Sequence, residues 1–215
     1  MAAPAAHAAT AQDGAVVPTA TTGAPVVQEA AVKPEVGGRL SDRHSVRGNG
    51  IRVRGLVKAG HGRALVSLRV RRAGTKSWHG VARKRVDVGK KFALKWRGGR
   101  PGRYVVRLTA QKSGKSSSDS LGTAYVYRSG HASWYGPGFY GGRTACGQRL
   151  TASIVGVANK SLPCGTRVTF HLNGRTVTAR VIDRGPFIAG RTWDLTPALK
   201  RKLHFGSTGT VHATS

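Results

Sequence analysis

Residues 181–195 read Val-Ile-Asp-Arg-Gly-Pro-Phe-Ile-Ala-Gly-Arg-Thr-Trp-Asp-Leu, and this run holds the only two acidic side chains of residues 129–215, Asp183 and Asp194. The chain of 215 residues has 36 Lys and Arg against 8 Asp and Glu, so acidic side chains are scarce throughout. Two of them close together in apolar, glycine-rich sequence are candidates for general acid–base chemistry, which needs a carboxyl group in a defined environment. The structural alternative is that each only pins a turn or caps a helix.

The formal net charge of +28 predicts a partner with negative charge. Nucleic acid, an anionic membrane and an anionic cell wall all fit, and basicity alone does not choose among them. No run approaches the ~20 apolar residues that span a bilayer, so we expect no transmembrane segment.

Residues 1–38 are rich in Ala, Thr, Val, Pro and Gly and contain no aromatic residue. Such a segment buries too little apolar surface to offset its ordering entropy, which predicts a disordered leader or linker. Ala6-His7-Ala8 resembles the cleavage site of a secretory signal without the basic and apolar parts that precede it. We therefore expect a secreted or wall-located protein whose signal peptide is missing from or truncated in this sequence.

Residues 39–128 alternate apolar and polar side chains in short runs separated by turn clusters, with no helical period. This pattern predicts an immunoglobulin-like β-sandwich. The runs are 52–57, 66–71, 92–97, 104–108 and 124–127. The region has 24 Lys and Arg against three acids, which favours adhesion to an anionic wall polymer, with a soluble spacer as the alternative. No recognition helix or aromatic platform supports specific nucleic-acid binding.

Residues 129–215 predict a small β-barrel with one short helix. Strands are expected at 132–135, 167–172, 176–182 and 209–213, and Asn173-Gly174 is a strong hairpin signal between two of them. A helix is expected over 196–203, with Thr196 as its cap and Pro197 at its first position.

Cys146 and Cys164 are the two cysteines, 18 residues apart. An even count with a single pairing favours a disulfide and an oxidising compartment. A zinc site is the weaker alternative, because there is no second cysteine pair and His171 lacks metal-ligand spacing. We expect neither a metal nor another cofactor.

Several motifs of this region, in this order, resemble the rare lipoprotein A family. They are Ala132-Ser133-Trp134-Tyr135-Gly136-Pro137-Gly138-Phe139, Gly142-Arg143-Thr144-Ala145-Cys146-Gly147, Leu162-Pro163-Cys164-Gly165-Thr166-Arg167-Val168, Asp183-Arg184-Gly185-Pro186-Phe187 and Trp193-Asp194-Leu195-Thr196. The resemblance covers essentially all of 129–215 and implies a six-stranded double-psi β-barrel, the fold of expansins and some lytic transglycosylases. The fold class expected for the chain is therefore all-β, a sandwich followed by this barrel.

The resemblance also implies an activity on peptidoglycan glycan strands: non-hydrolytic cleavage of the bond from N-acetylmuramic acid to N-acetylglucosamine, leaving a 1,6-anhydro sugar. It makes Asp194 the expected acid/base and Asp183 an orienting or electrostatic partner. A slot lined by Trp134, Tyr135 and Phe187 beside the acid is expected to raise its pKa by desolvation and to stack on sugars. The residues expected to bind substrate are Trp134, Tyr135, Gln148, Asn159, Arg184, Phe187 and Arg191.

This sequence departs from the family at three positions. Gln148, Thr151 and Asn159 stand where many members have Glu, Asp and His, so three groups that would share the proton are neutral here. A non-catalytic, expansin-like wall-binding or wall-loosening protein is therefore the alternative function. We expect a monomer in either case.

Overall fold

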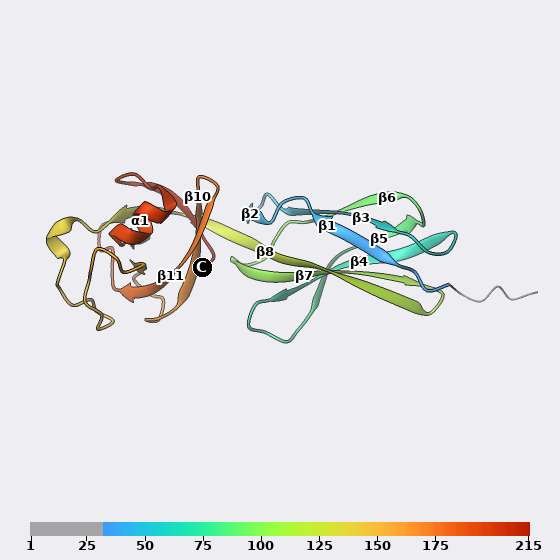
Figure 1. Cartoon of the computed structure of the whole chain (residues 1–215), viewed down its shortest axis with the longest axis horizontal. Helices are drawn as coiled ribbons and strands as arrows, with labels where there is room; N and C mark the ends of the chain where they lie inside the picture. The colour runs from blue at the N-terminus through green and yellow to red at the C-terminus, as the bar shows by residue number, and fades with distance from the viewer. Residues whose placement is uncertain (1–31) are drawn as a thin grey trace, which may run out of the picture. The chain divides into compact units, whose positions relative to one another are not determined.

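The computed structural model describes residues 32–215, and strands make up most of their regular structure (Figure 1). Most of the expected leader, 1–38, lies outside the described residues, as does the signal-like Ala6-His7-Ala8. The first strand, β1, begins at Val36. Within residues 32–215 we find no helix with the length and apolar character needed to cross a bilayer.

Two sheets share one apolar core in the first half of the described chain. The smaller sheet has the order β1-β3-β6, from β1 (Val36–Leu40), β3 (Ile51–Val57) and β6 (Lys91–Trp96). The other sheet contains β2 (His44–Val46), β4 (Arg63–Arg72), β5 (His79–Asp87), β7 (Gly102–Lys112) and β8 (Lys115–Trp134), in the order β5-β4-β7-β8-β2. All five runs expected to be strands in 39–128 lie at least largely within one of these elements.

The core is formed by every second residue of these strands. On β4 the buried positions are all apolar, and the positions between them face away from the core; the buried four are Ala64, Val66, Leu68 and Val70. Strand β7 repeats the pattern, and its Val106 and Leu108 pair in register with Val70 and Leu68. This period of two is what the sequence showed.

Strand β8 is 20 residues long and takes part in the pairing of both halves of the described chain. Its first part pairs with β7 as far as Val126 opposite Gly102. Its last part, from Arg128 onward, pairs with β13, and residues 132–134 pair with β12. No loop therefore separates the two halves where residue 128 meets residue 129.

The second half contains a closed ring of strand pairings around its own apolar core. Its elements are a short 3₁₀ turn, η1 (Pro137–Phe139), then β9 (Gly156–Ala158), β10 (Arg167–Leu172), β11 (Arg175–Asp183), β12 (Trp193–Leu195), α1 (Pro197–Leu203) and β13 (Gly209–Ala213). The pairings run β8-β12-β9-β11-β10-β13 and return to β8. The core they enclose contains Phe170, Trp193, Leu195, Leu199 and Leu203, among others.

Local signals located the hairpin and the helix correctly. Asn173 and Gly174 both have positive φ, 49° and 72°, as a tight two-residue hairpin turn requires. The Thr196 side chain accepts a hydrogen bond from the amide of Leu199, and Pro197 is the first helical residue.

Five strands were not expected from the sequence: β1, β2, β5, β9 and β12. β5 carries Arg83, Lys84 and Arg85 in succession, which hides its period of two. β9 and β12 have three residues each, too few to show any period, and they exist because neighbouring strands supply their hydrogen bonds.

Gly156 of β9 should be sensitive to substitution. A Cβ added there would lie 2.5 Å from Cδ1 and 2.7 Å from Cγ1 of Ile182, the residue before Asp183. We expect Gly156→Ala to lower the free energy of unfolding by about 1–3 kcal/mol, as overpacking does. Gly206→Ala, where a Cβ would meet open space, is the matched control and should change it by less than about 0.5 kcal/mol. Chemical unfolding followed by tryptophan fluorescence measures both, and equal effects would contradict the packing argument.

Candidate active site

Asp183 and Asp194 lie on two strands that flank β9. Asp183 is the last residue of β11 and Asp194 the middle residue of β12, and both pair in register with Ala158 of β9. Two strand spacings therefore separate their Cα atoms, about 10 Å. The fold thus brings the only two acidic residues of 129–215 to the same part of the barrel.

Asp194 is connected to a short hydrogen-bond chain. The hydroxyl of Ser133 donates to its Oδ1, and Nη1 of Arg191 donates to the same Ser133 oxygen at 3.1 Å. Ser133 pairs with Asp194 across the parallel β8–β12 ladder, which explains why the two side chains meet. One oxygen of the half-buried Asp194 carboxyl thus accepts a hydrogen bond from Ser133, and Ser133 in turn accepts one from the positively charged Arg191.

Asp183 is held more firmly, by three donors. They are the Tyr135 hydroxyl at 2.7 Å, the Ala145 amide at 2.7 Å and the amide of Arg184 at 2.8 Å. Burial raises the pKa of Tyr135 far above its usual 10, and the hydrogen bond to Asp183 and the charges of Asp183 and Asp194 raise it further. The Tyr135 hydroxyl therefore stays protonated and remains a donor.

Of the three aromatic residues expected to line a slot, Trp134, Tyr135 and Phe187, only Tyr135 forms a hydrogen bond with a carboxylate in residues 32–215. Side chains alternate along β8, so Ser133 and Tyr135 share the face of the carboxylates while Trp134 points to the other face. There Trp134 packs against the barrel core, with Nζ of Lys200 3.7 Å from its ring centre. Phe187 is 82% exposed.

An aromatic residue outside the expected set, Phe139, lies next to Tyr135. The two ring centres are 5.9 Å apart in an edge-on arrangement, and Phe139 is 62% exposed. Together with Tyr140, Phe187 and Ile188 it belongs to the exposed large apolar residues of the barrel.

The loop around residues 159–164 uses two of the expected substrate-binding residues for its own structure. Asn159 is buried; its Oδ1 accepts from the amides of Ser161 and Leu162, and its Nδ2 donates to the carbonyl of Thr192. Arg184 donates from Nη1 to the carbonyls of Asn159 and Leu162 at 3.3 and 2.9 Å. Within residues 32–215 no salt bridge joins Arg184 to Asp183.

The predicted disulfide between Cys146 and Cys164 is formed and connects this loop to the loop that carries Ala145. The amide of Cys146 also donates to the carbonyl of Ile182, so the Ala145 amide is positioned at Asp183 from two sides. Gln148 is exposed, and its side-chain oxygen accepts from the Thr144 hydroxyl at 3.2 Å. Thr151 accepts from the amide of Ile154 and so shapes the following turn.

Ser133, Phe139 and the Ala145 amide were not singled out from the sequence. The serine could have been found, because the alternation of 132–135 puts it on the same face as Tyr135. The Ala145 amide could not, since its position depends on the disulfide-linked loop.

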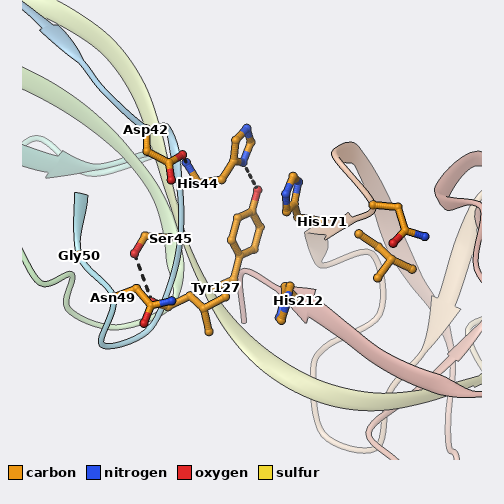
Figure 2. Close-up of a pocket in the computed structure, with 11 residues that line it drawn as sticks. Asp42, His44, Ser45, Asn49, Gly50, Tyr127, His171 and His212 are labelled. Atoms are coloured by element: carbon orange, nitrogen blue, oxygen red, sulfur yellow. Dashed lines mark hydrogen bonds between the residues drawn. The ribbon is translucent and has the colours of Figure 1, made fainter. Parts of the chain in front are cut away.

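Three imidazoles lie around a hollow whose lining includes neither Asp183 nor Asp194 (Figure 2). His171 of β10 stacks on His44 of β2, with ring centres 4.4 Å apart, and its ring centre lies 5.4 Å from that of Tyr127. His212 completes the group. In the described part of the chain no three His, Cys, Asp or Glu side chains are arranged to hold a metal ion.

Residues 127–214 match the family model described as a lytic transglycolase. The chain is 41% identical over 109 residues to a probable endolytic peptidoglycan transglycosylase RlpA of Synechocystis, a match that covers 49% of this chain and 34% of the relative. It is 39% identical over 102 residues to the endolytic peptidoglycan transglycosylase RlpA of Neisseria meningitidis, covering 46% and 43%. For the protein of the same name from Pseudomonas aeruginosa the identity is 43% over 94 residues, covering 42% and 28%. The chain thus spans less than half the length of these relatives.

His171 should make the fold sensitive to acid. Burial lowers its pKa below the usual 6.5, and the neighbouring His44 and His212 lower it further, while Asp42 opposes them. The unfolded chain therefore binds more protons than the folded one as the pH falls through about 6.5, and the free energy of unfolding decreases. We expect this decrease between pH 7.5 and pH 5 to be smaller in His171→Gln. Urea unfolding at both pH values measures it, and an unchanged pH dependence in the variant would contradict the assignment.

Proposed function

Residues 127–214 are a double-psi β-barrel domain of the rare lipoprotein A family, and from this we propose that the chain is a lytic transglycosylase that acts on peptidoglycan glycan strands. The observation that carries the proposal is the Asp194 carboxyl, held at one oxygen by Ser133 and with Arg191 one hydrogen bond further away. The reaction is cleavage of the β-1,4 bond from N-acetylmuramic acid to N-acetylglucosamine, leaving a 1,6-anhydro end.

One carboxyl group is sufficient for this chemistry. Protonated Asp194 donates its proton to the glycosidic oxygen as the bond to the anomeric carbon breaks. The 6-hydroxyl of the muramyl residue then attacks that carbon, and the Asp194 carboxylate takes up the hydroxyl proton, which restores the acid. No water enters, so no second carboxylate has to activate one, in contrast to inverting hydrolysis. The positive charge of Arg191 stabilises the carboxylate between the two steps.

Asp183 acts as a support in this proposal. Its oxygens accept from Tyr135, Ala145 and Arg184, so it has little capacity left to exchange a proton with a sugar. Its negative charge favours the positive charge that develops on the anomeric carbon.

The expected substrate-binding residues fall into two groups in this proposal. We assign sugar contact to Tyr135, Gln148, Phe187 and Arg191, and we add Phe139. Exposed aromatic rings suit stacking on the apolar faces of sugars. We assign Trp134, Asn159 and Arg184 to the support of the barrel and its loop, because their polar or aromatic groups already have partners within it.

We further propose that the barrel is six-stranded, that the region from β1 to residue 128 is an immunoglobulin-like sandwich serving as a basic wall-binding module, and that the residues before β1 are a leader; the expected boundary at residue 38 is wrong, because residues 36–38 belong to β1. The closed ring of pairings and the core shared by two sheets support the first two. Action on peptidoglycan requires an extracytoplasmic location, with a monomer as the working unit. A non-catalytic, expansin-like wall protein is the outcome that the activity test would reveal instead.

Asp194→Asn should abolish the release of 1,6-anhydromuropeptides from purified sacculi. Loss of a general acid lowers the rate by about 10²–10⁴-fold, because an amide cannot donate the proton at this position. Asp183→Asn should reduce the rate less, since it removes charge and not the proton donor. Chromatography of the released products, with masses, measures both.

Asp87→Asn is the matched control for these variants. Asp87 is exposed on β5, where it forms the single salt bridge of residues 32–215, 3.5 Å from Arg63, and surface pairs of this kind contribute little. Its activity should equal that of the wild type. A wild type that binds sacculi and releases no anhydro product would refute the enzymatic proposal and leave the expansin-like one.

Phe187→Ala should weaken substrate binding without harming the fold. The ring is 82% exposed, so its removal leaves no cavity, and the free energy of unfolding should change by less than about 0.5 kcal/mol. Loss of sugar stacking should raise KM several-fold and leave kcat within about twofold, as expected when a contact is equally strong in the ground state and the transition state. Steady-state kinetics on solubilised glycan strands provide the measurement, and an unchanged KM would remove Phe187 from the substrate contacts.

A further inference from the structure

Arginine side chains cluster on the outer face of the sheet β5-β4-β7-β8, where acidic side chains are scarce. The side chains between the buried positions of β4 and β7 point away from the core, and those of β5 continue the same face. We call this face the arginine face; its cluster consists of Arg69, Arg71, Arg83, Arg85 and Arg107. Within residues 32–215 none of the five has a carboxylate within salt-bridge distance.

The positive charges of these arginine side chains repel one another. Arg69 and Arg107 are directly opposite each other in the β4–β7 ladder, where like charges are destabilising. Arg83 and Arg85 pair with Ser67 and Leu65 of β4, so no residue of the neighbouring strand neutralises them. A bound anion would relieve this repulsion.

Trp78 holds two of the arginines in place. The guanidinium carbon of Arg107 is 4.4 Å from the centre of the Trp78 ring, and that of Arg71 is 5.3 Å from it. Guanidinium groups placed by an aromatic ring lose less side-chain entropy when they bind an anion. Nε of Arg71 is buried without a hydrogen-bond partner, so its contact with Trp78, and not a hydrogen bond at Nε, orients the group.

A hollow of about 580 Å³ adjoins this cluster on the same face. It is lined by Arg69 and Arg83 together with the polar side chains of Ser67, Thr109 and Gln111, and by Gly80, which has no side chain. A hollow of this size accepts a sugar or a short polyol unit. Cations beside hydroxyl and amide groups suit a ligand that carries both phosphate and hydroxyl groups.

A row of hydroxyls continues the polar face on β8. Ser117 and Asp119 point to the smaller sheet, where they accept from the amides of Val36 and Gly38. Because side chains alternate, Ser116, Ser118 and Ser120 face outward, and all three are exposed. Ser118 pairs with Thr109 in the β7–β8 ladder, so the hydroxyls extend from the hollow without a gap.

We propose that this face binds a phosphodiester-linked wall polymer, a chain of polyol or sugar phosphates, with the arginines on its phosphates and the hydroxyls on its polyol units. Arginine matches phosphate oxygens with two parallel hydrogen bonds, and same-face arginines on one strand lie about 6.8 Å apart, which suits a repeating anion. The inference rests on the proposed function for the wall location, and it does not require catalysis by the barrel.

The same face is poorly suited to the other large anions. Binding of single-stranded nucleic acid uses aromatic platforms for the bases, and the Trp78 ring beside this cluster is occupied by two arginines. Insertion into a membrane needs exposed apolar side chains. In the described residues the large exposed ones are Val32, Phe139, Tyr140, Phe187 and Ile188, none of them in this sheet.

The test is a triple variant of the full chain, Arg69→Gln, Arg83→Gln and Arg107→Gln. Its control is Arg52→Gln, Arg54→Gln and Lys95→Gln on the outer face of the β1-β3-β6 sheet, where Arg52 pairs with Lys95. Both variants lose three positive charges. A difference between them therefore reports the position of the lost charges and not the change in net charge. Circular dichroism and thermal unfolding confirm that both are folded.

Binding is measured to purified poly(glycerol phosphate) over a series of salt concentrations. The first triple variant should lose at least about tenfold in affinity at 0.15 M salt, and the slope of log affinity against log salt should fall by about 2, as expected for three lost phosphate contacts. The control should stay within about threefold of the wild type. Equal losses in the two variants would overturn the proposal, because net charge alone would then explain binding.

Further arms identify the source of the anion. The wild type should co-sediment with sacculi that carry the polymer. Much less protein should co-sediment with the same sacculi after hydrofluoric acid has removed the phosphodiester polymers. Tighter binding to duplex DNA or to phosphatidylglycerol vesicles than to the polymer would replace the proposal with a different partner.

The catalytic proposal can fail independently. The first triple variant should release anhydro products from stripped sacculi at the wild-type rate, and Asp194→Asn should bind the polymer like the wild type. Polymer binding by a wild type that releases no anhydro product would refute the enzyme and leave this inference intact.

Discussion

The pairing register of β8 is the constraint on which most of the structure depends. One continuous strand pairs with β7 and β2 in its first part and with β12 and β13 in its last part, so a single alternation of side chains serves two cores. Ala124 and Val126 face the first core and Ala132 the second. The same alternation then brings Ser133 to Asp194 and Tyr135 to Asp183. A shift of one residue would reverse every one of these contacts.

The charged side chains contribute little to the stability of the fold. Both cores are apolar, and residues 32–215 contain a single, exposed salt bridge, so ion pairing contributes little to folding. The basic side chains occupy positions that alternation directs outward, at the cost of mutual repulsion. The two acids of the barrel form no salt bridge within residues 32–215; one hydroxyl donates to Asp194, whereas one hydroxyl and two amides donate to Asp183.

Local sequence predicted those features that short-range physics determines. The alternating runs became strands, Asn173-Gly174 a hairpin, and Thr196-Pro197 the start of a helix, because each depends on residues that are neighbours in the chain. The disulfide followed from there being one possible pair.

Features that depend on distant partners were missed. The register of β8 directs Trp134, which was predicted to contact sugar, toward the barrel core and Lys200, and no pattern in the sequence indicated that contact. Strands β9 and β12 have no signal of their own, yet the pairing of β11 and β12 with Ala158 of β9 is what brings the two carboxylates together. The partners of Asp183 include a backbone amide that no side-chain pattern reveals.

In the proposed function, a basic face and a barrel that acts on glycan belong to one chain, and this combination has a physical advantage that neither has alone. Contacts between a shallow, exposed site and a neutral sugar chain are weak, since little surface is desolvated. A polyanion bound to the arginine face would keep the barrel close to the wall, so that binding of glycan becomes an intramolecular event at high effective concentration. Many weak phosphate contacts also exchange quickly, which lets the protein move along the wall while it remains bound. In this proposal, an additional carboxylate on the arginine face would weaken the binding of the polymer, which is consistent with the scarcity of acids on that face.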